Sequence, residues 1–212
     1  MMAKRSLINT NIYRYNASKE GRTDGRMERE KEKVFYVKVT DVNKIFPLDK
    51  FKRIKQEQWE ISIPRTTENS AGGRIRVRKE EIEGKTTITQ TIKTTIALND
   101  SIESTIPITE DLFTQVKQMS TGGMIKERVT LLVDSQKENN IIEVDLFPIT
   151  EGGYHQWIKV DIELTDMNVG IPVLPFSYLE ILESGIDSND KKIQNLFNNY
   201  FITKNLFLLP TK

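Results

Sequence analysis

Cysteine is absent from the 212 residues of this chain, and histidine occurs once, as His155. Without cysteine the chain forms no disulfide and offers no thiolate to a metal or a substrate. A single histidine also excludes a zinc site built from several imidazoles. A metal bound by these residues must be held by carboxylates, which favours Mg²⁺ or Mn²⁺ as the cofactor.

Long hydrophobic runs are also lacking. No apolar stretch approaches the ~20 residues that span a bilayer. The N-terminus carries Lys4 and Arg5 but no apolar segment of the secretory type. We therefore expect a cytoplasmic protein without a membrane partner.

An excess of one charge sign is missing as well. The chain has 31 basic and 30 acidic residues, for a formal charge of +1. This balance argues against a protein that coats nucleic acid with positive charge. Any functional charge must be concentrated locally.

Charged residues recur at every second position in several strand-like segments. Arg74, Arg76 and Arg78 alternate with Ile75 and Val77. Side chains alternate between the two faces of a strand, so the arginines share one face and the apolar residues share the other. The same alternation occurs at 30–32, 126–129, 143–145 and 159–163. One face of the predicted sheet is then both acidic and basic, which suits a metal ion bound beside a polyanion.

The periodicity predicts a mainly β fold of the α+β type, an antiparallel sheet closed on itself with helices outside. Seven strands are expected, at 30–39, 53–63, 74–80, 86–95, 124–134, 140–147 and 156–165. A helix is predicted at 109–118, with Thr109 as N-cap, and a second at 190–201. The charged faces would line the inside of the closed sheet. The alternative is an ordinary antiparallel sheet whose charged face meets water.

Three regions are expected along the chain. Residues 1–27 have little apolar periodicity and are predicted to form a flexible arm. Residues 28–168 would form the tunnel domain. Residues 169–212 would form a helical extension that packs on it.

The order of these motifs resembles the CYTH superfamily, also called triphosphate tunnel metalloenzymes. That family has a Glu-x-Glu-x-Lys strand, an Arg-x-Arg strand and a strand ending in lysine, then a helix and three further charged strands. The matching segments here are Glu30-Lys31-Glu32, Arg76-Val77-Arg78, Thr91-Ile92-Lys93, Lys126-Glu127-Arg128, Glu143-Val144-Asp145 and Asp161-Ile162-Glu163. The resemblance covers about residues 28–165.

The resemblance implies a closed eight-stranded antiparallel β-tunnel that acts on triphosphates with Mg²⁺ or Mn²⁺. Its substrates would be inorganic triphosphate, thiamine triphosphate, a nucleotide or an RNA 5′ end. The implied catalytic residues are Glu30, Glu32 and Lys33. The implied phosphate-binding residues are Arg74, Arg76, Arg78, Lys93, Lys126, Arg128 and Lys159. The implied metal ligands are Glu30, Glu32, Glu143, Asp145, Asp161 and Glu163.

One position departs from the family pattern, because Val34 stands where the motif lysine belongs. Lys33 is adjacent but points to the other face of a regular strand, and only a β-bulge would turn it inward. Beside hydrolysis, the sequence therefore keeps open a non-catalytic module that binds a nucleotide or polyphosphate. A cyclase and a structural β-domain with a solvated charged face are the remaining alternatives.

Overall fold

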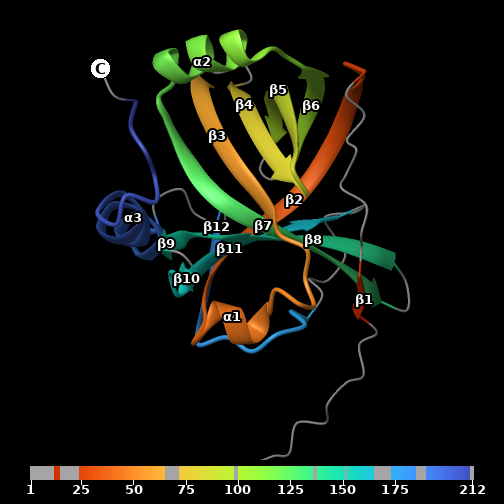
Figure 1. The fold of residues 1–212 in the computed structure, drawn as a ribbon, viewed down its shortest axis with the longest axis vertical. Coiled ribbons are helices and arrows are strands. Elements are labelled where there is room, and N and C mark those ends of the chain that lie inside the picture. Colours follow the sequence, from red (N-terminus) through yellow and green to blue (C-terminus); the bar gives the residue numbers. More distant parts are fainter. Residues whose placement is uncertain are drawn as a thin grey trace, which may run out of the picture.

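Eight antiparallel strands pair in the order β7–β3–β4–β5–β6–β2–β11–β8. Because β8 also pairs with β7, the strands form a ring (Figure 1). The structure is a computed structural model that describes residues 12–14, 24–64, 72–97, 100–135, 138–150, 152–164, 173–184 and 190–210. The mainly β fold expected from the sequence is confirmed.

The ring strands are long. They are β2 (Met27–Lys38), β3 (Ile54–Ile63), β4 (Gly73–Ile82), β5 (Lys85–Ala97), β6 (Asp100–Pro107), β7 (Gly122–Ser135), β8 (Glu138–Leu146) and β11 (Trp157–Glu163). Two further strands lie along the ring: β1 (Ile12–Arg14) pairs with β7, and β12 (Glu180–Ser184) pairs with β2. A separate two-stranded sheet joins β9 (Pro148–Thr150) and β10 (Gly153–Tyr154).

The helices of the described residues lie outside the ring. They are α1 (Val42–Ile45), α2 (Glu110–Met119), α3 (Lys191–Leu196) and the π-helix η1 (Phe197–Ile202), which continues directly from α3. Figure 1 shows α2 across the upper ends of the strands and α1 on the opposite side of the molecule. The ring strands therefore present two surfaces. α1 and α2 cover part of the outer surface, whereas η1 contacts Tyr36, which shares a face of β2 with Glu30 and Glu32.

The outer surface of the ring carries apolar residues, and one large cluster lies over β2, β8 and β11. Val37 of β2, Val144 of β8 and Val160 of β11 are all fully buried there. Phe46 and Leu174 belong to the same cluster and cover these strands. A large aliphatic or aromatic side chain contributes roughly 1.5–3 kcal/mol when it leaves water. Because the valines point outward, their charged neighbours in the sequence point inward.

A second apolar cluster lies beneath α2. Trp59 of β3 and Val77 of β4 are buried against Phe113 and Val116 of the helix. The neighbours of Val77 along β4 are arginines, so here too the covered face of the strand is apolar and the opposite face is charged.

A third apolar cluster attaches the C-terminal segment to the ring. Phe201 of η1 is 1% exposed, and its ring lies 5.3 Å from Tyr36 and 5.2 Å from Phe147. Leu196 and Leu206 are buried in the same cluster. The described part of the C-terminal segment therefore packs on the ring, and it includes the strand β12 as well as helices.

Several local predictions are confirmed. The helix at 109–118 is α2, and the Thr109 hydroxyl accepts a hydrogen bond from the Leu112 amide. The helix at 190–201 corresponds to α3 and η1, with Asp190 as the N-cap.

The strand β6 and the short helix α1 were not among the elements predicted from the sequence. Most of the predicted arm, at 1–11 and 15–23, lies outside the described residues, whereas 12–14 form β1. Within the described part of the chain, no helix is both long enough and apolar enough to cross a membrane.

The packing of Phe201 makes a prediction about stability. Replacing Phe201 with alanine removes a fully buried ring, so we expect the free energy of unfolding to fall by about 3–5 kcal/mol. Ile202→Ala is the matched control, because Ile202 is 42% exposed and should change stability little. Urea denaturation measures the free energy of unfolding of both variants. Equal, small effects of the two variants would show that the C-terminal segment is not part of the cooperative fold.

Candidate functional site

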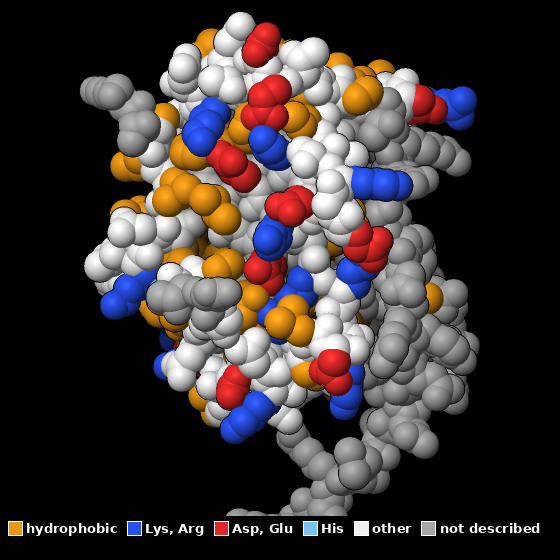
Figure 2. Space-filling model, in the orientation of Figure 1, with side chains coloured by type: hydrophobic (Ala, Val, Ile, Leu, Met, Phe, Trp, Pro, Cys, Tyr) orange, Lys and Arg blue, Asp and Glu red, His pale blue; other side chains and the backbone are white. Residues whose placement is uncertain are grey.

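A cavity of about 1270 Å³ is lined by residues from all eight ring strands. Its lining is mostly charged and polar, because the inward positions of the strands carry the charged residues. In the space-filling view, acidic and basic side chains alternate along the hollowed centre of the face shown (Figure 2). The inward orientation of the charged residues, expected from the alternation, is therefore observed.

One wall of the cavity is basic. Arg74, Arg76 and Arg78 all line it from β4. The Nε atom of each of these three arginines is buried and has no hydrogen-bond partner among the described residues. A buried donor without a partner is costly, so these groups are suited to an acceptor that enters the cavity.

Arg78 shows the local excess of positive charge. Burial, together with repulsion from Arg76 and Arg128, lowers the pKa of Arg78 to about 10. Glu80 offsets this only in part, through a 3.4 Å contact with Arg78 Nη1. An anion beside Arg78 would relieve the repulsion and raise its pKa again.

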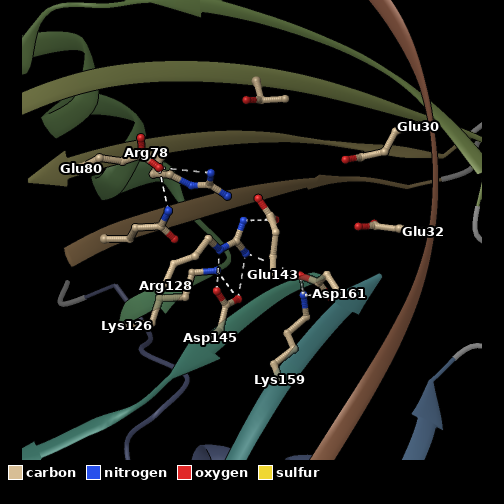
Figure 3. Close-up of polar contacts among 12 residues, drawn as sticks. Glu30, Glu32, Arg78, Glu80, Lys126, Arg128, Glu143, Asp145, Lys159 and Asp161 are labelled. Atoms are coloured by element: carbon tan, nitrogen blue, oxygen red, sulfur yellow. Dashed lines mark hydrogen bonds and ion pairs between the residues drawn. The ribbon is translucent and has the colours of Figure 1, made fainter. Parts of the chain in front are cut away.

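A buried ion-pair network continues the basic wall onto β7 and β8 (Figure 3). Lys126 Nζ donates to Asp145 Oδ2 at 2.5 Å, and Arg128 Nε donates to Asp145 Oδ1 at 2.7 Å. Arg128 also pairs with Glu143. Burial works to raise the pKa of Asp145, but Arg128 and Lys126 outweigh it and hold that pKa well below its usual range.

An acidic cluster gathers around one ammonium group. Lys93 Nζ lies 2.9 Å from Glu30 Oε2, 2.6 Å from Glu32 Oε1 and 3.0 Å from Glu103 Oε1. These carboxylates come from β2 and β6, and Lys93 comes from β5. Figure 3 shows Glu30 and Glu32 pointing from β2 into the ring interior. Three carboxylate oxygens therefore already converge on a cation.

Lys159 and Asp161 form a further pair on β11. Lys159 Nζ contacts Asp161 Oδ1 at 2.5 Å. Burial nevertheless raises the pKa of Asp161, with Asp145 and Glu32 adding to the effect. Asp161 lies opposite Val34 in the pairing of β11 with β2, so the Lys159 ammonium lies close to the position where the motif lysine is missing.

Most of the residues that the sequence predicted for the functional site line the same cavity. Those that line the cavity are Glu30, Glu32, Arg74, Arg76, Arg78, Lys93, Lys126, Arg128, Glu143, Lys159, Asp161 and Glu163. Asp145 is completely buried behind this lining, where it neutralises Lys126 and Arg128.

Lys33 is the exception and requires a correction. Its register with Ile162 of β11 is regular, without the bulge that would turn it inward. Its Nζ instead lies 3.9 Å from Glu183 of β12. Lys33 therefore does not join Glu30 and Glu32 in the cavity.

Other lining residues were not predicted as site residues. Glu103 was missed together with β6, although Glu103 and Thr105 alternate with Ile102, Ser104 and Ile106. That alternation was the available signal. The remaining unpredicted lining residues include Gln56, Gln58, Glu60, Glu80, Thr87, Thr89, Phe197 and Phe207. The two phenylalanines had no signal in the sequence, because they reach the cavity only through the path of the C-terminal segment.

Comparison with known proteins adds little. No protein-family model matches the chain, and no curated protein matches it. A solved structure of the PH1819 protein from Pyrococcus horikoshii OT3 is similar, with a TM-score of 0.40 and 14% sequence identity. The match covers 65% of this chain and 80% of that one. A likeness at this level says nothing about activity.

The buried network predicts a large effect of Asp145→Asn. The substitution leaves Lys126 and Arg128 buried without their shared counter-charge, so the free energy of unfolding should fall by about 3–5 kcal/mol. The control is Asp100→Asn, which removes only an exposed pair with Arg29 and should have little effect. Thermal and urea unfolding compare the two. A negligible loss in Asp145→Asn would mean that the network does not stabilise the fold.

The same carboxylate predicts a pH dependence. Because the pKa of Asp145 is lower in the folded state, the unfolded chain binds the proton more readily. The stability that Asp145 contributes is therefore complete above about pH 4, the ordinary pKa of an aspartate, and is lost as the pH falls further. The difference in stability between the wild type and Asp145→Asn should stay constant from neutral pH to about pH 5 and shrink below about pH 4. A difference that grows on acidification would contradict this assignment.

Proposed function

We propose that the chain binds a triphosphate-bearing molecule in this cavity and hydrolyses it with the help of a divalent metal ion. We further propose that the ring is a closed tunnel of the CYTH type. The observation that carries the proposal is the set of buried Nε donors of Arg74, Arg76 and Arg78 on one wall, which lack a partner among the described residues. Guanidinium groups bind phosphate oxygens in paired, charge-assisted hydrogen bonds, and a polyphosphate offers many such oxygens.

The acidic cluster supports the use of a metal through its donor chemistry. Carboxylate oxygens are the ligands that Mg²⁺ and Mn²⁺ prefer, and those of Glu30, Glu32 and Glu103 already converge on the Lys93 ammonium. Among the described residues, however, no group of three or more acidic or histidine side chains is arranged as a ready metal site. Lys93 would have to move away before Glu30 and Glu32, with Glu163 nearby, held a metal.

Different residues of the chain would bind different parts of the substrate. Arg74, Arg76 and Arg78 would hold and orient the phosphates, and Lys126 and Arg128 would extend this positive wall. A bound metal would neutralise phosphate charge and activate a water molecule.

Lys159 would offer the ammonium that Val34 cannot supply. Its contact with Asp161 holds the Lys159 ammonium in the cavity. Lys159 lies on β11, which pairs directly with β2, the strand that carries Glu32. Its charge also acts on Glu32 directly.

A second candidate is a module that binds the polyphosphate without cleaving it. The observation that favours it is the position of Lys93, which fills the centre of the carboxylate cluster. Both candidates predict binding, and they differ in whether added metal produces turnover.

Binding is tested with Arg78→Ala. A charge-assisted hydrogen bond contributes roughly 1.5–3 kcal/mol, so the affinity for inorganic triphosphate should fall about 10- to 150-fold. Lys79→Ala is the matched control, since Lys79 is the next residue on β4 but pairs with Glu110 of α2 on the outer surface. Isothermal titration calorimetry measures both. Equal affinities of Arg78→Ala and the wild type would show that the phosphate site does not lie on this wall.

Turnover is tested with Glu32→Gln. Glutamine keeps the shape of the side chain but lacks its charge, so metal-dependent phosphate release should be lost while the fold persists. Glu81→Gln, at an exposed position of β4, should retain wild-type activity. Phosphate release is assayed with Mg²⁺ and Mn²⁺ on inorganic triphosphate, thiamine triphosphate, ATP and 5′-triphosphate RNA, and circular dichroism checks the fold. Tight binding by the wild type without turnover of any of these would establish the binding module instead.

A further inference from the structure

One end of the cavity is aromatic, in contrast to its charged walls. Phe197 and Phe207 line it there, and both are half-buried. Their ring centroids are 5.5 Å apart. Phe201 also contributes to this lining, although it is 1% exposed. Its ring stacks on Phe197, with centroids 5.5 Å apart, and contacts Tyr36 and Phe147, which attaches the segment to the ring of strands. Phe197 and Phe207 therefore expose part of their aromatic surface to a cavity whose other walls carry charged side chains.

The close approach of Phe207 is built into the strand beside it. A Cβ atom at Gly122 would lie 2.2 Å from Phe207 Cζ, so a larger residue at this position would displace the ring. Gly122 pairs with Glu60 of β3, and Met124, two residues further along β7, pairs with Gln58. The aromatic end therefore adjoins the polar side chains of β3.

Gln58 gives a second, independent indication of a ligand. The residue is 6% exposed and lines the cavity, and its Oε1 atom is buried without a hydrogen-bond partner in the part of the chain that the structure describes. Its amide nitrogen donates one hydrogen bond, to Glu60 Oε1 at 3.2 Å, so the oxygen is the side-chain atom left without a partner. The side chain therefore offers an acceptor, and the group that satisfies it must be a donor such as an amino group.

We propose that the aromatic end binds the nucleobase of a nucleoside triphosphate, with Phe197 and Phe207 contacting the base and Gln58 accepting a hydrogen bond from its amino group. This inference rests on the proposed triphosphate site and narrows its substrate to nucleotides with an amino-bearing base. A planar base with a polar edge fits an aromatic surface beside an unpaired acceptor. Inorganic triphosphate would leave both unused.

Isothermal titration calorimetry measures how much the base and the triphosphate each contribute to affinity. The wild type is titrated with ATP, with inorganic triphosphate and with adenosine. Stacking of a base on aromatic side chains corresponds to about a 5- to 150-fold gain in affinity, so ATP should bind more tightly than inorganic triphosphate by a factor in this range. Phe197→Leu and Phe207→Leu should reduce that preference and leave the affinity for inorganic triphosphate unchanged.

Gln58→Leu and inosine triphosphate test the hydrogen bond. Inosine triphosphate carries a carbonyl where ATP carries its amino group, so the wild type should prefer ATP. Gln58→Leu should lose the preference, a change of about 2- to 12-fold. Equal wild-type affinities for ATP and inosine triphosphate would overturn the role of Gln58.

Three further outcomes would overturn one proposal or the other. Equal wild-type affinities for ATP and inorganic triphosphate would overturn the base site alone. Phenylalanine variants that weaken both ligands equally would also overturn it, since they would show a structural role. Binding of adenosine without any binding of inorganic triphosphate would overturn the proposed function and keep the base site.

Discussion

The structure depends on the burial of many charges of both signs inside one ring of strands. Charges removed from water must be paired or must bind an ion. Asp145 meets this requirement by accepting from Lys126 and Arg128, and Lys93 meets it by contacting three carboxylates. The arginine wall of β4 meets it least, because its three Nε donors lack a partner within the described residues. Internal pairing is therefore least complete at the wall where we propose that phosphate binds.

This inward charge also determines what surrounds the ring. A strand with charged residues inside has its apolar residues outside, and these must be covered. α2 covers Trp59 and Val77, while the region around Phe46 and Leu174 covers the strands on the other side. The C-terminal segment instead packs against Tyr36 and Phe147, which line the cavity, and it adds Phe197, Phe201 and Phe207 to the lining. The packing around the ring thus contributes to stability and also determines which side chains line the cavity.

The cavity joins three chemically different regions. The basic wall suits phosphate oxygens, the carboxylate cluster suits a cation, and the aromatic end suits an apolar ring. Lys93 links the first two, since its ammonium pairs with the carboxylates. Release of Lys93 from Glu30 and Glu32 would make both the ammonium and the carboxylates accessible to a ligand.

The sequence by itself determined which charged residues share a face on each predicted strand, because alternation along a strand fixes the face of every side chain once one is known. It also determined α2 and its cap at Thr109. It did not determine β6, the pairing of β3 with β7 and of β2 with β11 that completes the ring, or the contact of Lys33 with Glu183. Nor did it determine that Asp145 lies behind the cavity wall, or that aromatic rings line one end of the cavity. These features were decided by the tertiary structure, because they depend on contacts between segments far apart in the chain, which no local periodicity records.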